Sequence, residues 1–177
     1  MSEKRTAKVV KASDVKPSEM VQGKLGASSQ RLGVAAGGWS LGCTLVELAV
    51  GNQAFPNHFH SAMEESIYVL EGEGTLRIGK EEMKIVAGDY AAFPPGPDFS
   101  HSITNTGKNK LRYLCMSAPA SPITVDVVGY PDSKRIAFAA GVQPGKVAWR
   151  DGAWVMKLIK EDTPQVGYFD DEPMAQK

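Results

Sequence analysis

This sequence has few cysteines, few histidines and no net charge. Its 177 residues include two cysteines and three histidines, and 20 basic side chains balance 20 acidic ones. Two isolated cysteines cannot form a zinc site of paired cysteines. Cys43 and Cys115 each lie in an apolar run, so we expect two buried, reduced thiols, with a disulfide as the alternative. The absence of net charge does not indicate a strongly basic surface, so no nucleic-acid partner is expected.

Long apolar runs are also missing. No stretch approaches the roughly 18 apolar residues of a membrane helix. Residues 1–22 contain no apolar segment of signal-peptide length. We therefore expect a cytoplasmic protein that has no membrane partner.

Glycine and proline, by contrast, are abundant: 18 glycines and 11 prolines occur among the 177 residues. Together they exceed the combined average share of these two residue types, which is about 12%. This excess indicates many tight turns and favours an all-β fold over a helical bundle. Short strands at near-regular spacing are typical of a sandwich or barrel. The β-type runs cover residues 43–50, 66–71, 75–78, 82–86, 90–93, 101–105 and 111–116.

The segments that flank these runs differ in composition. Residues 1–22 are polar and charged and are predicted to form an N-terminal arm, with a short strand at Val9-Val10. Residues 23–40 are rich in glycine, alanine and serine and are expected to be irregular or to form a short edge strand. The main β domain is predicted to span residues 23–130.

Residues 131–177 are predicted to form a C-terminal extension that packs on the barrel or on a partner. Within it, Asp151-Gly152 between apolar flanks predicts a hairpin over residues 146–158. That register would set Trp149 opposite Trp154; the alternative is a surface loop with two unrelated tryptophans. Residues 161–177 are acidic and are expected to form a frayed tail.

The three histidines and one glutamate form a candidate metal site. His58 and His60 are spaced His-x-His, and on a strand residues i and i+2 point to the same face. Glu64 and Glu65 follow within one loop's reach, and His101 lies in a later β-type run. Three neutral nitrogens and one carboxylate suit a divalent first-row transition metal.

The context of these residues resembles the cupin superfamily over residues 41–117. Residues 58–72 read H-x-H-x4-E-x6-G, which is similar to the first cupin motif. Residues 88–105 read G-x5-P-x-G-x4-H-x3-N, which is similar to the second. Two loops are longer than the motifs, by one residue before the first histidine and by two before the last. Residues 130–141 also resemble a tail of single-domain bacterial cupins.

This resemblance implies an antiparallel jelly-roll β-barrel that holds one metal ion inside. The ligands carried over from the motifs are His58, His60, Glu65 and His101. Glu65 is chosen over Glu64 because only Glu65 stands six residues before the motif's closing glycine, Gly72. The residues do not distinguish iron, manganese, zinc and nickel.

Four protein ligands leave about two positions on a six-coordinate metal, which is typical of a catalytic site. We therefore expect a metal-dependent enzyme of isomerase or dioxygenase type, or a decarboxylase, that acts on a small oxygenated metabolite. The alternative is a non-catalytic module that binds a metal and a small ligand. A serine nucleophile is disfavoured because no G-x-S-x-G turn occurs. The resemblance also implies a homodimer that pairs through sheet edges.

Several other side chains have two interpretations. Asn105 is expected to form hydrogen bonds near a hairpin rather than to bind metal. Arg77 and Arg112 could hold an anionic substrate, although a solvated strand face is the expected place for both. Three aromatic residues could either line a pocket or pack in the core, and core packing is expected for them. They are Phe93, Tyr68 and Trp39.

Overall fold

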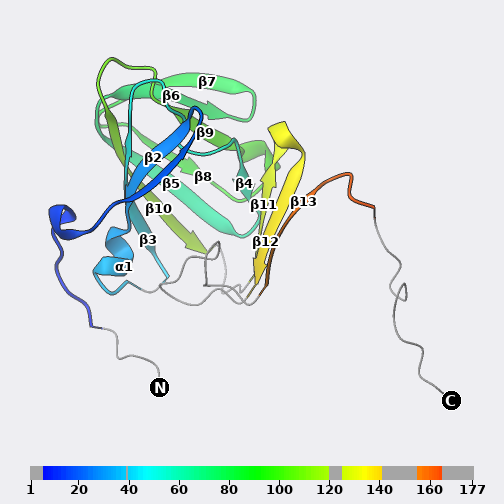
Figure 1. Cartoon of the computed structure of the whole chain (residues 1–177), viewed down its shortest axis with the longest axis horizontal. Coiled ribbons are helices and arrows are strands. Elements are labelled where there is room, and N and C mark those ends of the chain that lie inside the picture. The colour runs from blue at the N-terminus through cyan, green and yellow to red at the C-terminus, as the bar shows by residue number, and fades with distance from the viewer. Residues whose placement is uncertain (1–5, 39, 120–124, 141–154, 165–177) are drawn as a thin grey trace.

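Antiparallel β-strands make up most of the fold in the computed structural model, which describes residues 6–38, 40–119, 125–140 and 155–164 (Figure 1). One short helix, α1 (Leu32–Ala35), and three 3-10 turns, η1 (Ala12–Asp14), η2 (Pro97–Phe99) and η3 (Pro131–Ser133), accompany them. No helix among these residues has the length and apolar character that crossing a membrane requires. The strands are β1 (Ser18–Gln22), β2 (Leu25–Gln30), β3 (Gly42–Leu48), β4 (Phe59–His60), β5 (Met63–Glu71), β6 (Glu73–Ile78), β7 (Glu81–Val86), β8 (Tyr90–Phe93), β9 (His101–Thr104), β10 (Leu111–Pro119), β11 (Val125–Tyr130), β12 (Arg135–Ala140) and β13 (Val155–Lys160).

The strands form a jelly-roll sandwich whose sheets are not closed into one continuous barrel. One layer is a six-stranded sheet in the order β1-β2-β3-β10-β5-β8. The other contains a three-stranded sheet, β7-β6-β9, and a four-stranded sheet, β13-β12-β11-β4. An isolated antiparallel bridge between His58 and His101 links the segment before β4 to β9. This bridge connects the two smaller sheets at the point where the histidines lie.

The observed strands confirm the predicted β-type runs between residues 43 and 116. Alternation explains β6, where Gly74 and Leu76 are buried and Thr75 between them is half-buried. Gly72 turns the chain from β5 into β6 with a φ of 84°. A Cβ there would also collide with the carbonyl oxygen of Lys110. This turn therefore depends on glycine.

The N-terminal predictions need two corrections. Val9 and Val10 form no strand, and Val9 is almost fully exposed, so it has no sheet to pack against. The segment expected to be irregular instead contains β2, which lies inside the sheet between β1 and β3. The small residues Gly26 and Ala27 of β2 are buried, and Gly23 closes the β1–β2 hairpin with a φ of 62°.

Part of the C-terminal prediction lies outside the described residues. Trp149 and Trp154 of the predicted hairpin and the chain from residue 165 onward are not described. The same holds for Trp39, which lies nearer the N-terminus. The last strand, β13, pairs with β12, and β12 with β11, in an antiparallel sheet beside the main body (Figure 1).

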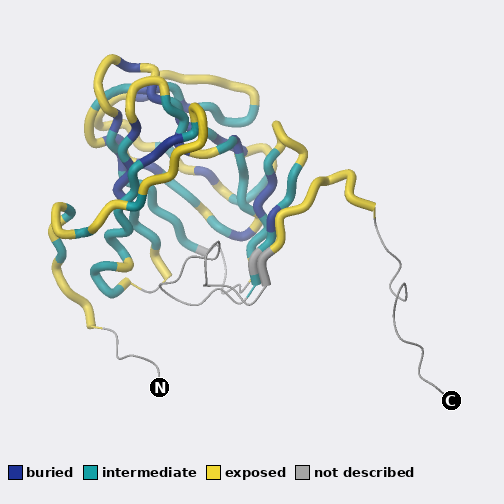
Figure 2. The backbone as a smooth tube through the Cα atoms, in the orientation of Figure 1, coloured by how far each residue is buried: buried dark blue, intermediate teal, exposed yellow. Residues whose placement is uncertain are grey.

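The core lies between the two layers, where Figure 2 shows the darkest parts of the tube. Leu48, Val69, Leu76 and Leu111 are completely buried there. Burying each such side chain stabilises the fold by roughly 1.5–3 kcal/mol. The larger cluster also contains residues whose other side faces a cavity, namely Val46, Ala54, Ile67, Phe93, Ile103 and Tyr113.

Asn105 is the hydrogen-bonding residue that the sequence predicts. Its side chain is fully buried. Its Nδ2 donates to the carbonyl oxygens of Leu48 and Asn109, both at 2.9 Å, and its Oδ1 accepts from the amide of Gly107 at 3.0 Å. The side chain thus closes the turn between β9 and β10 and ties it to β3.

The two cysteines are free thiols, as expected, and no disulfide joins them. Each is half-buried rather than buried as expected. They lie on neighbouring strands, where β3 and β10 pair Cys43 with Met116 and Thr44 with Cys115. Burial raises the pKa of both thiols, and that of Cys115 lies well above its ordinary value.

Candidate metal centre

Backbone pairing places the three histidines side by side. The amide of His58 donates to the carbonyl of His101 at 3.1 Å, and the amide of His101 donates back to the carbonyl of His58 at 2.8 Å. His60 follows two residues after His58 and lies on β4, so its side chain points the same way. Glu65 faces them from β5, in the other layer. Elements from both layers therefore supply the cluster.

Three of the predicted ligands, the histidines, converge on a carboxylate oxygen of the fourth, Glu65. Oε2 of Glu65 lies 3.3 Å from Nε2 of His101, 3.5 Å from Nε2 of His60 and 3.7 Å from Nε2 of His58. The ligand atoms of His58, His60 and Glu65 all lie within 4.8 Å of one another. Glu64, the alternative acid, is exposed on the same strand.

Backbone carbonyls fix the orientation of two imidazole rings. Nδ1 of His58 lies 2.8 Å from the carbonyl oxygen of Pro56, and Nδ1 of His101 lies 3.1 Å from that of Phe99. A carbonyl oxygen only accepts hydrogen bonds, so each Nδ1 carries the proton. When the ring is neutral, each Nε2 then has its lone pair directed at the centre of the cluster, where a metal would need it.

A carboxylate, that of Asp126, fixes the orientation of the third imidazole ring, which belongs to His60. Nδ1 of His60 donates to Oδ2 of Asp126, and Oδ1 of Asp126 accepts from the amide of Ala62 at 3.0 Å. Asp126 lies on β11, which pairs with β4 so that Val128 faces His60. Sequence reasoning missed Asp126 because it lies 66 residues from His60 and outside both motifs. Only the pairing of β11 with β4 brings it to the cluster.

Burial and mutual charge set the protonation of the cluster. Burial, followed by the positive charge of His101, lowers the pKa of His58 to about 4. Burial opposes the charged form of His60, but the hydrogen bond to Asp126 and the charge of Glu65 outweigh it and raise its pKa. Burial also opposes the charge of Glu65, yet the hydrogen bond with His101 and the nearby imidazoles lower its pKa. Glu65 is therefore ionised and His58 neutral near pH 7.

Aromatic side chains hold two of the rings from the sides. The ring of Phe93 stacks on His101 with centroids 3.8 Å apart and planes 12° apart. The ring of Tyr130 lies 6.1 Å from that of His58 in a stacked arrangement. Phe93 is buried, so it belongs both to the core and to the wall of the site. For Tyr68 the expectation of core packing is wrong, because this residue is 41% exposed.

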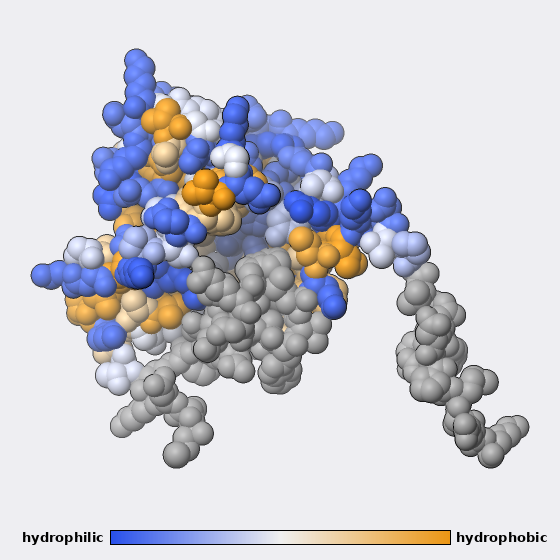
Figure 3. Space-filling model, in the orientation of Figure 1, coloured by the Kyte–Doolittle hydropathy of each residue, from blue (hydrophilic) through white to orange (hydrophobic). Residues whose placement is uncertain are grey.

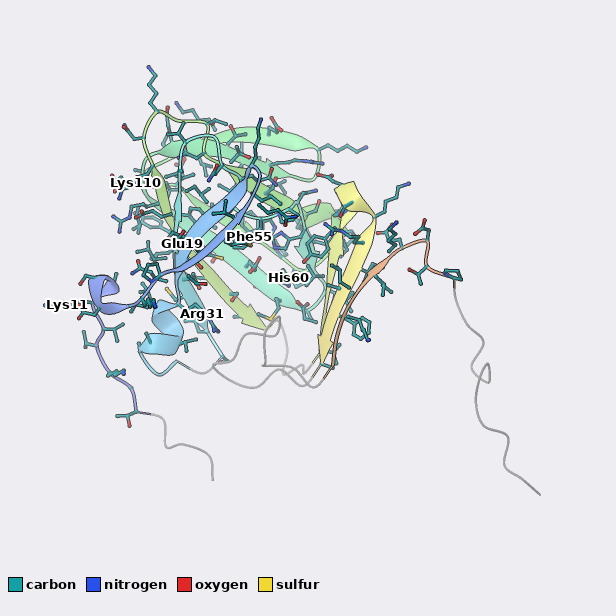
Figure 4. All side chains as sticks on the ribbon, viewed as in Figure 1. Lys11, Glu19, Arg31, Phe55, His60 and Lys110 are labelled. Atoms are coloured by element: carbon teal, nitrogen blue, oxygen red, sulfur yellow. The ribbon has the colours of Figure 1, made fainter. Side chains whose placement is uncertain are left out.

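The cluster lies in the wall of a cavity of about 370 Å³. Figure 3 shows this face of the molecule hollowed between β2 and the β11–β12–β13 sheet. The stick view shows Phe55 and His60 between β2 and this sheet (Figure 4). The cavity is lined by Ser29, Arg31, Thr44, Val46, Ala54, Phe55, Pro56, His58, His60, Glu65, Ile67, Phe93, His101, Ser102, Ile103, Tyr113, Cys115, Ser117, Val128 and Tyr130.

The two arginines considered for substrate binding lie elsewhere. Arg77 pairs with Asp132 at 2.8 Å. Arg112 pairs with Glu47 at 3.0 Å and with Glu71 at 3.3 Å. Neither lines the cavity, and both are half-buried and ion-paired rather than simply solvated. The arginine that does line it, Arg31, follows β2 and was not singled out by sequence reasoning, since no motif contains it.

Known proteins share this fold and part of this sequence. A putative sugar phosphate isomerase from Acidithiobacillus ferrooxidans has 26% identity and a TM-score of 0.72, covering 89% of this chain and 95% of its own. A sugar phosphate isomerase from a cupin superfamily, from Silicibacter pomeroyi, shares the fold with 22% identity and a TM-score of 0.73, covering 91% of this chain and 98% of its own.

A curated relative and a protein family match the central part of the sequence. An uncharacterised protein of Methanocaldococcus jannaschii is 37% identical over 62 residues, which are 35% of this chain and 48% of that protein. The chain thus spans about half the length of that relative. The family described as Cupin domain matches residues 44–117, which contain both motifs and all three histidines. Residues 44–117 of the chain therefore match the cupin domain family.

Proposed function

We propose that this protein is a metal-dependent enzyme that acts on a small oxygenated metabolite. In this proposal His58, His60, Glu65 and His101 bind one divalent transition metal ion. One observation carries it: three imidazole Nε2 atoms lie 3.3–3.7 Å from a single oxygen of Glu65. A cluster that served only to stabilise the fold would not need every ring turned with Nε2 toward the same point.

The spacing of these donor atoms suits a metal ion. Protein nitrogen and oxygen ligands bind such ions at roughly 2.0–2.2 Å. Two donors on one ion are then separated by about 3.0 Å at right angles or about 3.4 Å in a tetrahedron. The separations from Glu65 begin at 3.3 Å and end at 3.7 Å, so small side-chain movements would complete the site. Carbonyl oxygens and Asp126 already hold the outer nitrogens, as in metal-binding histidines generally.

The reaction would use the residues that surround the ion. Bound here, a divalent metal supplies Lewis-acid polarisation of a carbonyl or hydroxyl oxygen of the substrate. The apolar walls formed by Val46, Ile67 and Ile103 exclude water from that oxygen. Burial raises the pKa of Tyr130, so its phenol stays protonated and is able to donate a hydrogen bond to a substrate oxygen.

Isomerisation is the first reaction to test, since both similar solved structures are described as sugar phosphate isomerases, one of them as putative. It moves hydrogen between two adjacent oxygen-bearing carbons and needs no external oxidant. A dioxygenase-type reaction is the second, and it requires a redox metal such as iron. The cavity volume of about 370 Å³ suits a small metabolite for either reaction.

The first experiment measures metal binding. Wild-type protein is loaded with Mn²⁺, Fe²⁺, Ni²⁺ or Zn²⁺, and its metal content is compared with that of Glu65→Gln and Glu64→Gln. Glu64 is the matched control, because it is the neighbouring carboxylate but is exposed. We expect about one ion per chain in the wild type and in Glu64→Gln, and a loss in Glu65→Gln. Equal metal content in all three proteins would contradict the proposed ligands.

The second experiment measures turnover. Loaded protein is incubated with aldose and ketose phosphates, and isomer formation is followed by NMR; oxygen uptake is followed with the iron-loaded sample. Turnover that disappears in Glu65→Gln supports an enzyme. Metal and ligand binding without turnover would instead identify the non-catalytic binding module.

We also propose that the protein is a homodimer. Strand β1 lies at the edge of the six-stranded sheet, and its Met20 and Val21 are 40% and 74% exposed. Unpaired edge strands usually require cover. Light scattering at micromolar concentration is expected to give twice the chain mass of 19.0 kDa, and a monomeric mass would refute the dimer.

A further inference from the structure

We propose that the cavity binds an oxyanion-bearing metabolite, with Arg31 holding the anionic group while another oxygen of the same molecule lies at the histidine–glutamate cluster. This inference rests on the proposed function and deepens it by naming the chemical class of the ligand. Arg31 is the one lysine or arginine among the described residues that line the cavity. Figure 4 shows it where β2 ends and α1 begins.

The sheet register places Arg31 on the wall of the cavity. Strands β2 and β3 pair Ser29 with Val46 and Gln30 with Leu45. The next residues of the two strands are Arg31 and Thr44. Ser29 and Arg31 both line the cavity, as two residues of one strand face should.

Arg31 and Glu65 belong to one sheet but to different parts of it. The sheet order β2-β3-β10-β5 separates their chain segments by three strand spacings, roughly 14 Å between backbones. The long arginine side chain and the carboxylate shorten this gap from both ends. A metabolite of a few carbon atoms would therefore bridge the guanidinium and the histidine–glutamate cluster.

The charges of the cavity lining favour an anion. Apart from the histidines, Glu65 and Arg31 are the acidic and basic side chains among the described residues of the lining. An anionic group of the ligand would complement the guanidinium of Arg31.

The chemistry of arginine narrows the ligand further. A guanidinium presents paired N–H donors that match the oxygens of a carboxylate or a phosphate. The hydroxyl groups of Ser29, Thr44 and Ser117 line the same cavity and offer further hydrogen bonds. Both carboxylates and phosphates carry this shared oxyanion chemistry, and separate arms of the experiment distinguish them.

The test titrates zinc-loaded protein with inorganic phosphate, with malonate and with uncharged glycerol, and follows binding by ¹H–¹⁵N NMR. Wild type, Arg31→Gln, Arg31→Lys and Arg112→Gln are compared. Arg112 is the matched control, because it is an arginine on β10 whose charge is paired outside the cavity. Circular dichroism and the melting temperature establish that each variant is folded.

We expect phosphate or malonate to bind the wild type and Arg112→Gln equally, and Arg31→Gln at least tenfold more weakly. Arg31→Lys should recover part of the affinity, because it keeps the charge but loses the fork of donors. Stronger binding of phosphate than malonate would identify phosphorylated ligands, and the reverse would identify carboxylates. Equal anion affinity in wild type and Arg31→Gln, or binding of glycerol alone, would overturn the inference.

The same titration on metal-free protein separates the two proposals. If the chain binds no zinc but still binds anions through Arg31, the proposed function fails and the anion site stands. If zinc binds at one ion per chain but anion affinity ignores Arg31, the inference fails and the metal site stands.

Discussion

Replacing Asp126 with asparagine is expected to weaken the binding of a divalent metal by about 10- to 100-fold. The aspartate accepts two hydrogen bonds, from Nδ1 of His60 and from the amide of Ala62. An asparagine side chain has a single oxygen, so it can accept only one of these bonds in the same place.

Both orientations of the asparagine are unfavourable. If its oxygen keeps the bond to Ala62, its NH₂ group faces Nδ1 of His60. The imidazole then satisfies that donor only by moving its own proton to Nε2, the nitrogen that the metal needs. If the oxygen keeps the bond to His60, the NH₂ group faces the amide of Ala62, and two donors oppose each other.

The expected magnitude follows from the bond that is lost. A hydrogen bond to a charged group contributes about 1.5–3 kcal/mol, and 1.4 kcal/mol corresponds to a tenfold change in affinity. Asp126 itself is partly exposed, with 21% of its side chain accessible, so the lower half of the range is the better expectation.

The assay is competition for Zn²⁺ between the protein and a fluorescent chelator at pH 7.5. Glu71→Gln is the control, since it removes an exposed carboxylate that pairs with Arg112. We expect wild-type affinity for the control and the weakened affinity for Asp126→Asn, with both variants folded by circular dichroism. An Asp126→Asn affinity within twofold of the wild type would refute the idea that this carboxylate orients His60.

Three further predictions concern stability and reactivity. Asn105→Ala removes three hydrogen bonds from a buried turn, so denaturant titration should show a loss of about 3 kcal/mol in the free energy of unfolding; a loss below 1 kcal/mol would contradict its role. Gly72→Ala should lower the melting temperature, because a Cβ at this positive φ meets the carbonyl of Lys110. Gly51→Ala should lower the melting temperature less, because Gly51 also has a positive φ but no atom stands close to its added Cβ. Because burial raises the pKa of Cys115 well above its ordinary value, this thiol stays protonated at pH 8; in a Cys43→Ser variant, Ellman's reagent should react at least tenfold faster after unfolding in urea, and equal rates would contradict its burial.

Local patterns explain why much of the fold could be predicted. Alternation within each run and glycine at the turns determine strands such as β6, and these signals need only neighbouring residues. The order of strands in the sheets depends on pairings between distant segments, which local patterns do not contain. For this reason β2 was expected to be irregular or an edge strand, although it lies within the six-stranded sheet.

The candidate site shows the same division. His58, His60, Glu65 and His101 stand at motif spacings, and the structure brings all four together. Asp126 and Arg31 belong to no motif and lie outside residues 44–117, the part that matches the cupin family. They reach the site because β11 pairs with β4 and β2 pairs with β3. Residues that orient ligands or select substrates are therefore the part of the site that required the three-dimensional structure.

The most direct test of the metal centre is a crystal structure of the loaded protein with anomalous scattering recorded at the absorption edge of the metal. We expect one strong peak at roughly 2.0–2.2 Å from Nε2 of His58, His60 and His101 and from a carboxylate oxygen of Glu65. A peak at other residues, or no peak in protein that was saturated with each of the four metals, would contradict it.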